Sequence, residues 1–505
     1  MKGLVLSLAF LAAAGLSVLP ARAEAAVDMP GKRLAATKAK PRSVAPAKTI
    51  AEKAQIDGFS RTWKLYVPER CKGETPVPLV VALHGFGGPS MDYSSAWHIT
   101  AEREGFIVLY PEAMPPKWWN IWELRKDKDA PDDVSYLDYI IEDTCKKYAV
   151  DRSRIYLTGV SMGDNMATTY AFRRADRLAA IAPTDGPTLP SILVDEKTGD
   201  FRMRPGYAVP SLRLHAELDS MAGLPSTYQQ YSITQSEYDR VVPLAERQAL
   251  RHMMDESMKK LWLEKNGCTG LPKLHLDEKR NFAVYSGAGN CDYVACSTLG
   301  EGHGGGFERS DLLWDFLSCF ARENGQVVRA KVASPVVADR NAVAIAAGAR
   351  RAYVDNTLVD MPKGMAMENK GELFVPVSFL PVAFPGTTVS VDKKSETAVV
   401  TWKGKTLKMG ASRPLMLVDD KVVDCPEPFM AKGELMAPAR TLARDFYAMH
   451  YDDEFEAAYI SEQPARLSYD FAADFRVMLG RDKAPSADIS MEKAAVQKIL
   501  DSRSK

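Results

Sequence analysis

Short apolar runs alternate with amphipathic segments from about residue 57 onward. Two of the amphipathic segments, Val134–Lys147 and Asp164–Arg173, repeat apolar residues at helical spacing. The apolar runs have the length and aliphatic content of buried parallel strands; they are Leu79–Leu83, Phe106–Tyr110, Ile155–Thr158, Ala179–Ala182 and Leu212–His215. This alternation predicts an α/β domain over residues 51–325, with a mostly parallel sheet and helices on both faces.

The pattern changes after Asn324-Gly325, where we expect the first domain to end. Residues 326–350 are rich in Ala, Val and Arg, which indicates a connector. Residues 351–461 predict a small α+β domain of short strands separated by Gly, Asp and Lys turns; the strand-like runs are Leu373–Val377, Thr388–Val391, Ala398–Trp402 and Leu415–Val418. Residues 462–505 carry alternating charge and two helix-like pieces, and we expect a C-terminal tail.

The N-terminus has the pattern of an export signal over residues 1–23. Lys2 precedes an apolar run, Leu4–Leu19, and Pro20 comes just before the small-residue site Ala21-Arg22-Ala23. The run is shorter than the roughly 20 residues of a spanning helix, so no membrane span is expected after cleavage. Residues 24–50 are mostly Ala, Lys, Arg and Pro, typical of a disordered linker. The pattern predicts a secreted, periplasmic or cell-surface protein.

Composition excludes several classes of protein. The 505 residues are 46% hydrophobic and 26% charged, which is typical of globular multi-domain chains. Lys plus Arg and Asp plus Glu are both 65, so the basic surface of a nucleic-acid-binding protein is not expected. Seven cysteines are too few for a disulfide scaffold, and seven scattered histidines lack H-E-x-x-H spacing. We therefore expect no metal site and no cofactor, and the oligomeric state stays open.

Gly159-Val160-Ser161-Met162-Gly163 is the clearest chemical motif. It follows an apolar strand and precedes a helix-like segment, which is the context of a nucleophile elbow. The flanking glycines permit a turn tight enough to lift the Ser161 hydroxyl above the sheet. Ser161 is therefore the candidate nucleophile.

A serine nucleophile needs a general base, which in turn needs an orienting carboxylate. His303 is the candidate base because it lies in the glycine-rich stretch Gly300–Gly306, where the backbone leaves room for close approach. Asp219 is the candidate acid because it follows the strand Leu212–His215, at the carboxyl end where sheet ligands gather. Glu217 and Asp185 remain alternatives.

Acyl transfer also needs two backbone N–H donors for the developing oxyanion. Met162 supplies one by its position directly after Ser161. Phe86, in the loop after the strand Leu79–Leu83, is the expected second donor, with Gly87 as an alternative. His84 begins that loop, and we expect it to hold the loop rather than transfer protons.

These residues resemble the polyhydroxybutyrate depolymerase and feruloyl esterase-like branch of the α/β-hydrolases over about residues 55–325. The stretches that carry the resemblance are Gly58-Phe59-Ser60-Arg61, Tyr66-Val67-Pro68, Leu83-His84-Gly85, Gly105 through Pro111, Asp132-Asp133-Val134 and the Ser161 motif. The resemblance implies the α/β-hydrolase fold and ester hydrolysis. It also implies a disulfide between Cys268, in Asn266-Gly267-Cys268, and Cys291, with Cys296 as the competing partner.

Two features depart from that branch. Gly304-Gly305-Gly306-Phe307 follows the histidine where the branch usually has Trp-Pro, and the segment from Asp219 to Asn266 is longer than the family needs. The longer segment predicts either a lid or a surface helical insertion. Its aromatic residues include Tyr228, Tyr231 and Tyr238.

Trp118, Trp119 and Trp122 cluster in a loop after Pro115-Pro116. The resemblance places tryptophans of this loop near the substrate, where they would stack on an aromatic acyl group or a polymer repeat unit. Core anchoring of the loop is the alternative for each of them. Asp132 and Asp133 are expected to cap a helix rather than to act as catalytic acids.

The second domain resembles the copper amine oxidase N-terminal-like domain of bacterial exported proteins. Leu373–Val377, Pro381-Val382-Ala383 and the strands up to Val400 carry the resemblance, and residues 436–460 repeat the pattern. The resemblance implies no copper site, and the stretch offers only His450 and Cys425 as soft ligands. We expect an accessory domain for binding or display.

Together these features predict an exported serine carboxylic ester hydrolase that works through an acyl-enzyme. Its expected partner is an ester, polymeric substrates included: a feruloyl-type ester of plant cell-wall polysaccharide, a polyhydroxyalkanoate or an aromatic polyester. Two alternatives remain. A non-catalytic binding protein could keep the hydrolase fold, and an acyltransferase would use the same residues.

Overall fold

The computed structural model describes most of the chain beyond the N-terminal segment. The described residues are 49–88, 94–115, 118–121, 130–186, 193–195, 197–198, 200–219, 221, 232–304, 309–330, 339, 341–361, 364–444 and 448–504. The predicted signal peptide and most of the predicted linker lie outside them.

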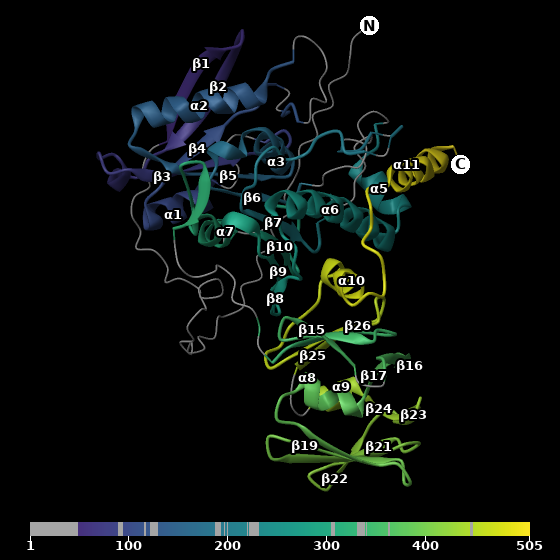
Figure 1. Cartoon of the computed structure of the whole chain (residues 1–505). Helices are drawn as coiled ribbons and strands as arrows, with labels where there is room; N and C mark the ends of the chain where they lie inside the picture. Colours follow the sequence, from purple (N-terminus) through teal and green to yellow (C-terminus); the bar gives the residue numbers. More distant parts are fainter. Residues whose placement is uncertain are drawn as a thin grey trace, which may run out of the picture.

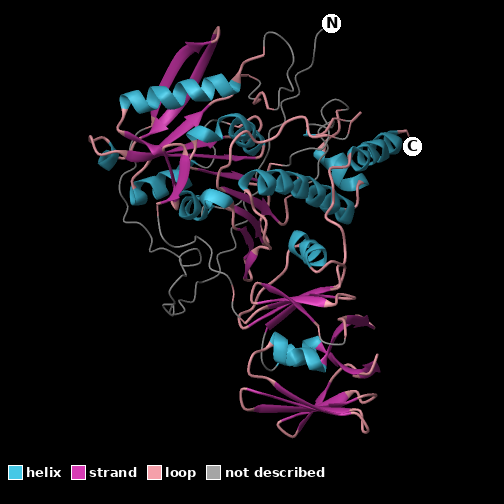
Figure 2. Cartoon of the chain, viewed as in Figure 1, coloured by secondary structure: helices cyan, strands magenta, loops and turns pink. Residues whose placement is uncertain are grey.

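The N-terminal domain follows the predicted alternation of strands and helices (Figures 1 and 2). Its strands are β1 Ile50–Ile56, β2 Phe59–Tyr66, β3 Val77–Leu83, β4 Ile107–Pro111, β5 Val150–Val160, β6 Ala180–Thr184, β7 Ser211–Ala216, β8 Lys273–Leu276, β9 Arg280–Tyr285 and β10 Tyr293–Thr298. Its helices are α1 Ser94–Glu104, α2 Asp133–Lys147, α3 Met162–Arg174, α5 Gln235–Val241, α6 Leu244–Asn266 and α7 Arg309–Leu317.

These strands form one sheet in the order β1-β2-β4-β3-β5-β6-β7-β10-β9-β8. The central strands β4, β3, β5, β6, β7 and β10 pair in parallel with their neighbours in this order. β2 runs antiparallel to both β1 and β4. Asp57 and Gly58, both with positive φ, make the β1–β2 turn, which suits the twist of a two-residue hairpin. All carboxyl ends of the parallel strands therefore lie along one edge, where the site is built.

The sheet is buried on both faces, so its central strands read as continuous apolar runs. In β3, Leu79 and Val81 belong to one hydrophobic cluster, whereas Val80 belongs to the other. Helices α2, α3 and α6 contribute to the first cluster, and α1 and α7 contribute to the second. The result is the predicted three-layer α/β arrangement.

The end of this domain differs from the prediction. Asn324 and Gly325 both have positive φ and form the turn between β11 Phe320–Glu323 and β12 Gln326–Arg329. An Asn-Gly pair fits a tight hairpin turn as well as a domain end, and here the hairpin forms. β12 thus begins in the segment predicted as a connector.

The accessory module, residues 342–461, consists of three small antiparallel sheets around its own core. Its strands are β13 Val343–Ala346, β14 Arg351–Val354, β15 Thr357–Asp360, β16 Met367–Asn369, β17 Glu372–Pro376, β18 Thr388–Asp392, β19 Thr397–Trp402, β20 Lys405–Gly410, β21 Leu415–Val418, β22 Lys421–Asp424, β23 Phe429–Ala431, β24 Glu434–Pro438, β25 Ala448–Asp452 and β26 Ala457–Ser461, and its helices are α8 Leu380–Ala383 and α9 Ala439–Arg444. β13, expected to be connector, pairs with β14 and β26, so the module begins before residue 351.

The C-terminal part of the chain forms two helices, α10 Tyr469–Met478 and α11 Ile489–Arg503. Both helices pack against the N-terminal domain (Figure 1). α11 lies beside α5, and its Ile499 is fully buried in the cluster that α2 and α3 share. α10 packs between α6 and the β13–β26 pair. The segment predicted as a tail is therefore a structural part of the molecule.

The long segment before Asn266 forms two helices. Tyr238 of α5 is fully buried, and α6 runs for 23 residues with one face in the core. The described part is therefore helical, but it is not a surface insertion, because both helices have side chains in the core. Tyr228 and Tyr231 lie outside the described residues.

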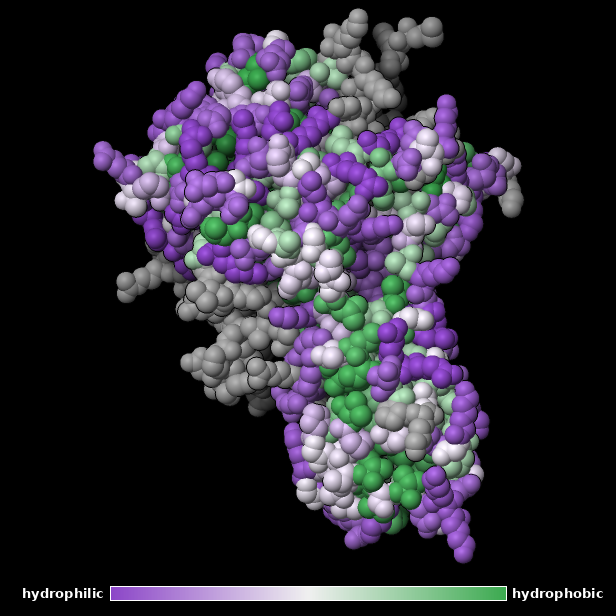
Figure 3. Space-filling model, viewed as in Figure 1, coloured by the Kyte–Doolittle hydropathy of each residue, from purple (hydrophilic) through white to green (hydrophobic). Residues whose placement is uncertain are grey.

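The described surface carries its apolar side chains unevenly. In Figure 3 the visible face is largely hydrophilic over the N-terminal domain and carries a run of apolar side chains along the accessory module. The exposed large apolar residues of the module are Val382, Val391, Val399, Leu415 and Val422. Among the described helices, none combines the length and apolar character that crossing a membrane requires.

Candidate active site

Ser161 lies at the junction of β5 and α3 with φ 58° and ψ −121°. A positive φ is costly for a residue with a Cβ and persists only where its surroundings impose it. Here the Ser161 N–H donates to Thr184 O at 2.9 Å, and Ser161 O accepts from Asn165 N at 3.2 Å. The strand–turn–helix junction has the geometry of a nucleophile elbow.

The glycines of the motif are required by packing. A Cβ on Gly159 would overlap the carbonyl of Gly163, and a Cβ on Gly163 would overlap the carbonyl of Leu83 in β3. Gly186 in the neighbouring loop is equally constrained, since a Cβ there would overlap Ser161 O. The turn therefore depends on three close backbone approaches, two of them at glycines of the Gly159–Gly163 motif.

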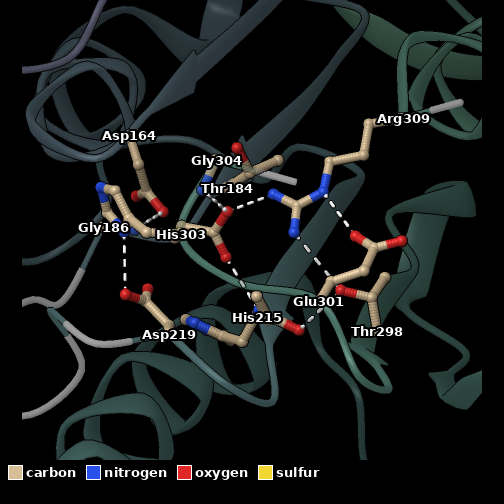
Figure 4. A network of polar contacts seen from close by, with 12 residues as sticks. Asp164, Thr184, Gly186, His215, Asp219, Thr298, Glu301, His303, Gly304 and Arg309 are labelled. Carbon is tan, nitrogen blue, oxygen red and sulfur yellow. Dashed lines mark hydrogen bonds and ion pairs between the residues drawn. The ribbon is translucent and has the colours of Figure 1, made fainter. Parts of the chain in front are cut away.

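Asp219 and His303 meet at the carboxyl edge of the sheet (Figure 4). Asp219 Oδ1 lies 2.9 Å from His303 Nδ1 and also accepts from Met221 N at 2.8 Å. The Asp219 side chain is 4% exposed and the His303 side chain 26%. The carboxylate is therefore shielded while the imidazole keeps an open face.

The pKa of His303 is raised above its ordinary 6.5. Burial acts in the opposite direction, but the hydrogen bond to Asp219 and the negative charges of Asp219 and Asp185 outweigh it. Arg309 lowers the pKa and partly offsets these charges. The imidazolium that proton transfer creates is thus favoured at this position.

The two alternative acids, Asp185 and Glu217, accept hydrogen bonds from backbone N–H groups and not from the imidazole of His303. Asp185, 1% exposed, accepts from Ala216 N at 2.8 Å, from Gly304 N at 3.1 Å and from Arg309. Glu217 accepts from Gly300 N at 2.8 Å and pairs with Arg466. Both carboxylates therefore hold the strand ends and the histidine loop (residues 298–304) in place.

Arg309 is a residue that sequence reasoning missed. Its guanidinium joins Asp185, Glu301 and Thr298, so it holds the histidine loop at two residues that precede His303 (Figure 4). Asp164, fully buried on α3, was also missed: it accepts from Gly186 N at 2.9 Å and from Arg213 at 3.0 Å. Polar residues at the start of a predicted helix beside the nucleophile were the available signal for Asp164.

The loop after β3 lies against the nucleophile. A Cβ on Gly85 would be 3.3 Å from Ser161 Cβ, which places the Phe86 segment beside the elbow. His84 Nε2 accepts from Ala113 N at 3.1 Å, and its Nδ1 lies 2.6 Å from Gly85 O. His84 thus holds the loop, as expected. Met162 begins α3, so its N–H points from a helix N-terminus, where negative charge is stabilised.

The tryptophans separate into different roles. Trp119 is 2% exposed and donates from Nε1 to His84 O at 2.9 Å, so it anchors the loop from the core. Trp118 is partly exposed and makes an edge contact with Phe86, with ring centroids 4.9 Å apart. Trp122 lies outside the described residues. The burial of Trp119 favours the alternative expected for it, core anchoring of the loop.

Asp132 and Asp133 also separate. Asp132 is the N-cap of α2, as predicted, and accepts from Val134 N and Ser135 N. Asp133 is fully buried and pairs with Arg61 at 2.6 Å. It therefore balances a buried cation and does not cap the helix.

All seven cysteines lie in the described part of the chain, and each is a free thiol. The predicted Cys268–Cys291 bridge is therefore not present in this structure. The two residues are nonetheless neighbours, since Cys268 Sγ lies 3.9 Å from Cys291 O. Burial raises the pKa of both thiols to about 11. Cys296 is buried in β10.

One cluster of side chains has the composition of a cation site. His252, Glu256 and Asp474 each place one potential ligand atom within 4.8 Å of the others. The Lys259 ammonium, however, pairs with Glu256 and lies 3.0 Å from Asp474. The ammonium of Lys259 thus already occupies the space between the two carboxylates and pairs with both.

The strand order, with an antiparallel β2 and the elbow after β5, defines the α/β-hydrolase fold. Residues 61–245 match the family described as Esterase PHB depolymerase, and residues 353–459 match the Copper amine oxidase N-terminal domain. Both predicted resemblances are confirmed.

Proteins similar to this chain include esterases and a depolymerase. A bifunctional acetylxylan esterase/xylanase of Neocallimastix patriciarum is 32% identical over 28% of this chain and 20% of its own. Feruloyl esterase B of Piromyces equi is 25% identical over 50% of this chain and 44% of its own. The chain thus spans less than half the length of either relative. A poly(3-hydroxybutyrate) depolymerase from Bordetella parapertussis is 17% identical, with a TM-score of 0.35 over 53% of this chain and 86% of that one.

Proposed function

We propose that this chain is a serine carboxylic ester hydrolase. The observation that carries the proposal is the 2.9 Å contact between Asp219 Oδ1 and His303 Nδ1, on loops at the same sheet edge as the Ser161 elbow. A buried carboxylate that orients an imidazole, at the sheet edge that also carries a strained serine, supports a site for nucleophilic attack on an acyl group.

In the proposed reaction Ser161 Oγ attacks the ester carbonyl while His303 Nε2 accepts the hydroxyl proton. Asp219 keeps the Nδ1 proton in place and stabilises the imidazolium. His303 then returns the proton to the leaving alcohol, and the C–O bond breaks to give the acyl-enzyme. Water, deprotonated by His303, attacks the acyl-enzyme and releases the acid and free Ser161.

The oxyanion of both tetrahedral intermediates would accept hydrogen bonds from the amides of Met162 and Phe86. Removal of one such donor typically costs about 3 kcal/mol of transition-state stabilisation. The first amide follows the nucleophile in α3, and the second belongs to the loop that Gly85 places beside Ser161.

Apolar residues near the site support an aromatic or other apolar ester. Phe86 is 50% exposed and Leu218, next to Asp219, is 64% exposed. Phe86 and Trp118 together offer a ring pair on which an acyl group could stack. Relatives and the matching family are named as feruloyl esterases and polyhydroxybutyrate depolymerases, and both ester types suit an apolar surface of this kind.

The test compares hydrolysis of methyl ferulate, a hydroxybutyrate oligomer and a bis-hydroxyethyl terephthalate ester by the wild-type chain, Ser161→Ala and Ser395→Ala. Ser395 lies in an exposed turn of the accessory module and serves as the matched control. We expect turnover by the wild-type and control chains only, and the preferred substrate names the ester class. Turnover that survives in Ser161→Ala contradicts the proposal.

Two further results would assign a different function. Binding of these esters without Ser161-dependent turnover, together with no labelling by an active-site phosphonate, would identify a binding protein. Transfer of the acyl group to an added alcohol in preference to water would identify an acyltransferase.

We also propose that the chain is exported, on the pattern of residues 1–23. The mature chain should begin at Glu24. N-terminal sequencing of protein collected outside the cytoplasm tests this, and a retained Met1 in that fraction would contradict it.

A further inference from the structure

A short stretch after the accessory module docks on the loops that hold Asp219 and His303. This return segment, residues 465–474, is fixed to the N-terminal domain by backbone contacts. Arg466 N donates to Asp277 O at 3.2 Å and Arg466 O accepts from Asn281 Nδ2 at 2.6 Å. Ser468 N donates to Asn281 Oδ1 at 2.8 Å, and Asn281 is fully buried.

From the outer side, the Arg466 guanidinium pairs with Glu217 Oε2. The same oxygen accepts from Gly300 N at 2.8 Å. Glu217 belongs to the acid turn, residues 216–219, and Gly300 to the histidine loop. One carboxylate oxygen therefore joins the two loops, and Arg466 fixes the position of that carboxylate.

From the inner side, Asp470 of α10 acts through Arg251 of α6. Asp470 Oδ2 accepts from Arg251 Nη2 at 2.8 Å. Arg251, 2% exposed, lies with Nη1 3.3 Å from Glu217 O and 3.5 Å from Ala216 O. The backbone of the acid turn is thus held by a buried cation whose counter-charge comes from the return segment.

The two loops also bind each other through their backbones. Glu217 N donates to Thr298 O at 2.9 Å, and Leu218 N donates to Glu301 O at 2.8 Å. A shift of the acid turn would therefore move Asp219 relative to His303. Misplacement by about 1 Å can cost on the order of 100-fold in rate.

We infer that Arg466 and Asp470 are positioning residues for the Asp219–His303 pair, so that the chain beyond the accessory module completes the support of the active site. This inference rests on the proposed function. Neither residue touches the substrate; each acts through the acid turn.

The Arg466 pair is suited to the test because its loss should leave the fold intact. Arg466 is 44% exposed, and exposed ion pairs contribute little to stability. Arg503 of α11 is the matched control, since it pairs with Glu237 at 2.8 Å in the same C-terminal region but away from the acid turn.

The experiment compares Arg466→Ala, Arg466→Lys and Arg503→Ala in the full chain on a soluble ester. We expect Arg466→Ala to lower kcat by about 10-fold with KM changed by less than about twofold, because a positioning loss acts on the transition state. Arg466→Lys should recover part of kcat, and Arg503→Ala should match the wild type. Equal kcat in Arg466→Ala and Arg503→Ala would overturn the inference.

A second readout does not need turnover. The His303 Nδ1 proton bound to Asp219 should give a downfield proton NMR line, identified by its loss in Asp219→Asn. We expect this line to shift or broaden in Arg466→Ala and not in Arg503→Ala. If the wild type shows no Ser161-dependent turnover, the proposed function fails, and an unchanged line in Arg466→Ala then overturns the positioning role as well.

Glu217→Gln provides a second variant should Arg466→Ala fail to fold. The amide oxygen can still accept from Gly300 N, whereas the charge that holds Arg466 is gone. It should reproduce the loss of kcat and the NMR change. If Glu217→Gln has both the kcat and the NMR line of the wild type, the inference is overturned.

Discussion

At the scale of single residues, opposing influences set the proton affinity of His303. Burial lowers its pKa, and the hydrogen bond to Asp219 with the charges of Asp219 and Asp185 raises it further than burial lowers it. Arg309 limits the increase. The base is therefore poised by the same residues that hold its loop.

This balance predicts the pH dependence of the reaction. Because only neutral His303 can accept the Ser161 proton, kcat/KM should fall as the pH drops below the pKa of His303. That pKa is raised, so the acidic limb should lie above the ordinary 6.5. A pH profile with an uncharged ester measures it, and an acidic limb below 6.5 would contradict the geometry.

Asp219→Asn tests the assignment of the acid. The amide keeps the shape but loses the charge and favours the wrong tautomer of His303, so kcat should fall by about 10³–10⁴-fold. Glu217→Gln should cost far less, since Glu217 does not contact the imidazole. Steady-state kinetics of the two variants test which carboxylate is the acid. A larger loss of kcat in Glu217→Gln than in Asp219→Asn would reverse the assignment.

At the scale of elements, the start of α2 shows how neighbouring carboxylates differ. Asp132 caps the helix at its surface, and Asp133 balances Arg61 in the core while accepting from Asn120 N at 2.6 Å. A lost cap leaves water as a replacement partner. A lost buried counter-charge leaves no replacement.

The two losses should differ in the free energy of unfolding. Asp132→Ala should cost about 1 kcal/mol, and Asp133→Ala about 3 kcal/mol because Arg61 stays buried without a partner. Urea denaturation measures both, with Asp132→Asn as the control that keeps a capping side chain. Equal costs would show that Arg61 finds another partner.

At the scale of the whole molecule, the C-terminal helices join parts that are far apart in sequence. Leu274 and Leu276 of β8, Ala344 of β13 and Phe471 of α10 share one hydrophobic cluster. Ile499 of α11 belongs to the core of the N-terminal domain. The N-terminal domain, the accessory module and the last helices are therefore packed against each other through apolar contacts.

This packing predicts that α11 stabilises the N-terminal domain. Ile499→Ala should cost about 3 kcal/mol, since it leaves a cavity in the main core. Met491→Ala, on the exposed side of the same helix at 37% exposure, should change stability by less than about 0.5 kcal/mol. Thermal unfolding followed by tryptophan fluorescence compares them, and equal behaviour would mean that α11 does not share the core.

Much of the fold follows from the sequence because its signals are local. The apolar runs placed β3 to β7 within two residues at most ends, except that β5 begins at Val150, five residues before the predicted start. The spacing of glycines around Ser161 identified the elbow, since only glycine permits those backbone approaches. Asp132 was identified as a cap by its position directly before a helical period.

Other outcomes required the tertiary structure because they depend on contacts between distant residues. Asp185, Glu217 and Asp219 all follow strands, and only the paths of the loops bring Asp219 to His303, 84 residues away. Trp118 and Trp119 are adjacent in sequence, yet only Trp119 enters the core. The docking of residues 465–504 depends on surfaces presented by β8, α5 and α6. The periodicity of residues 465–504 indicated two helices, but it could not indicate the domain against which these helices pack.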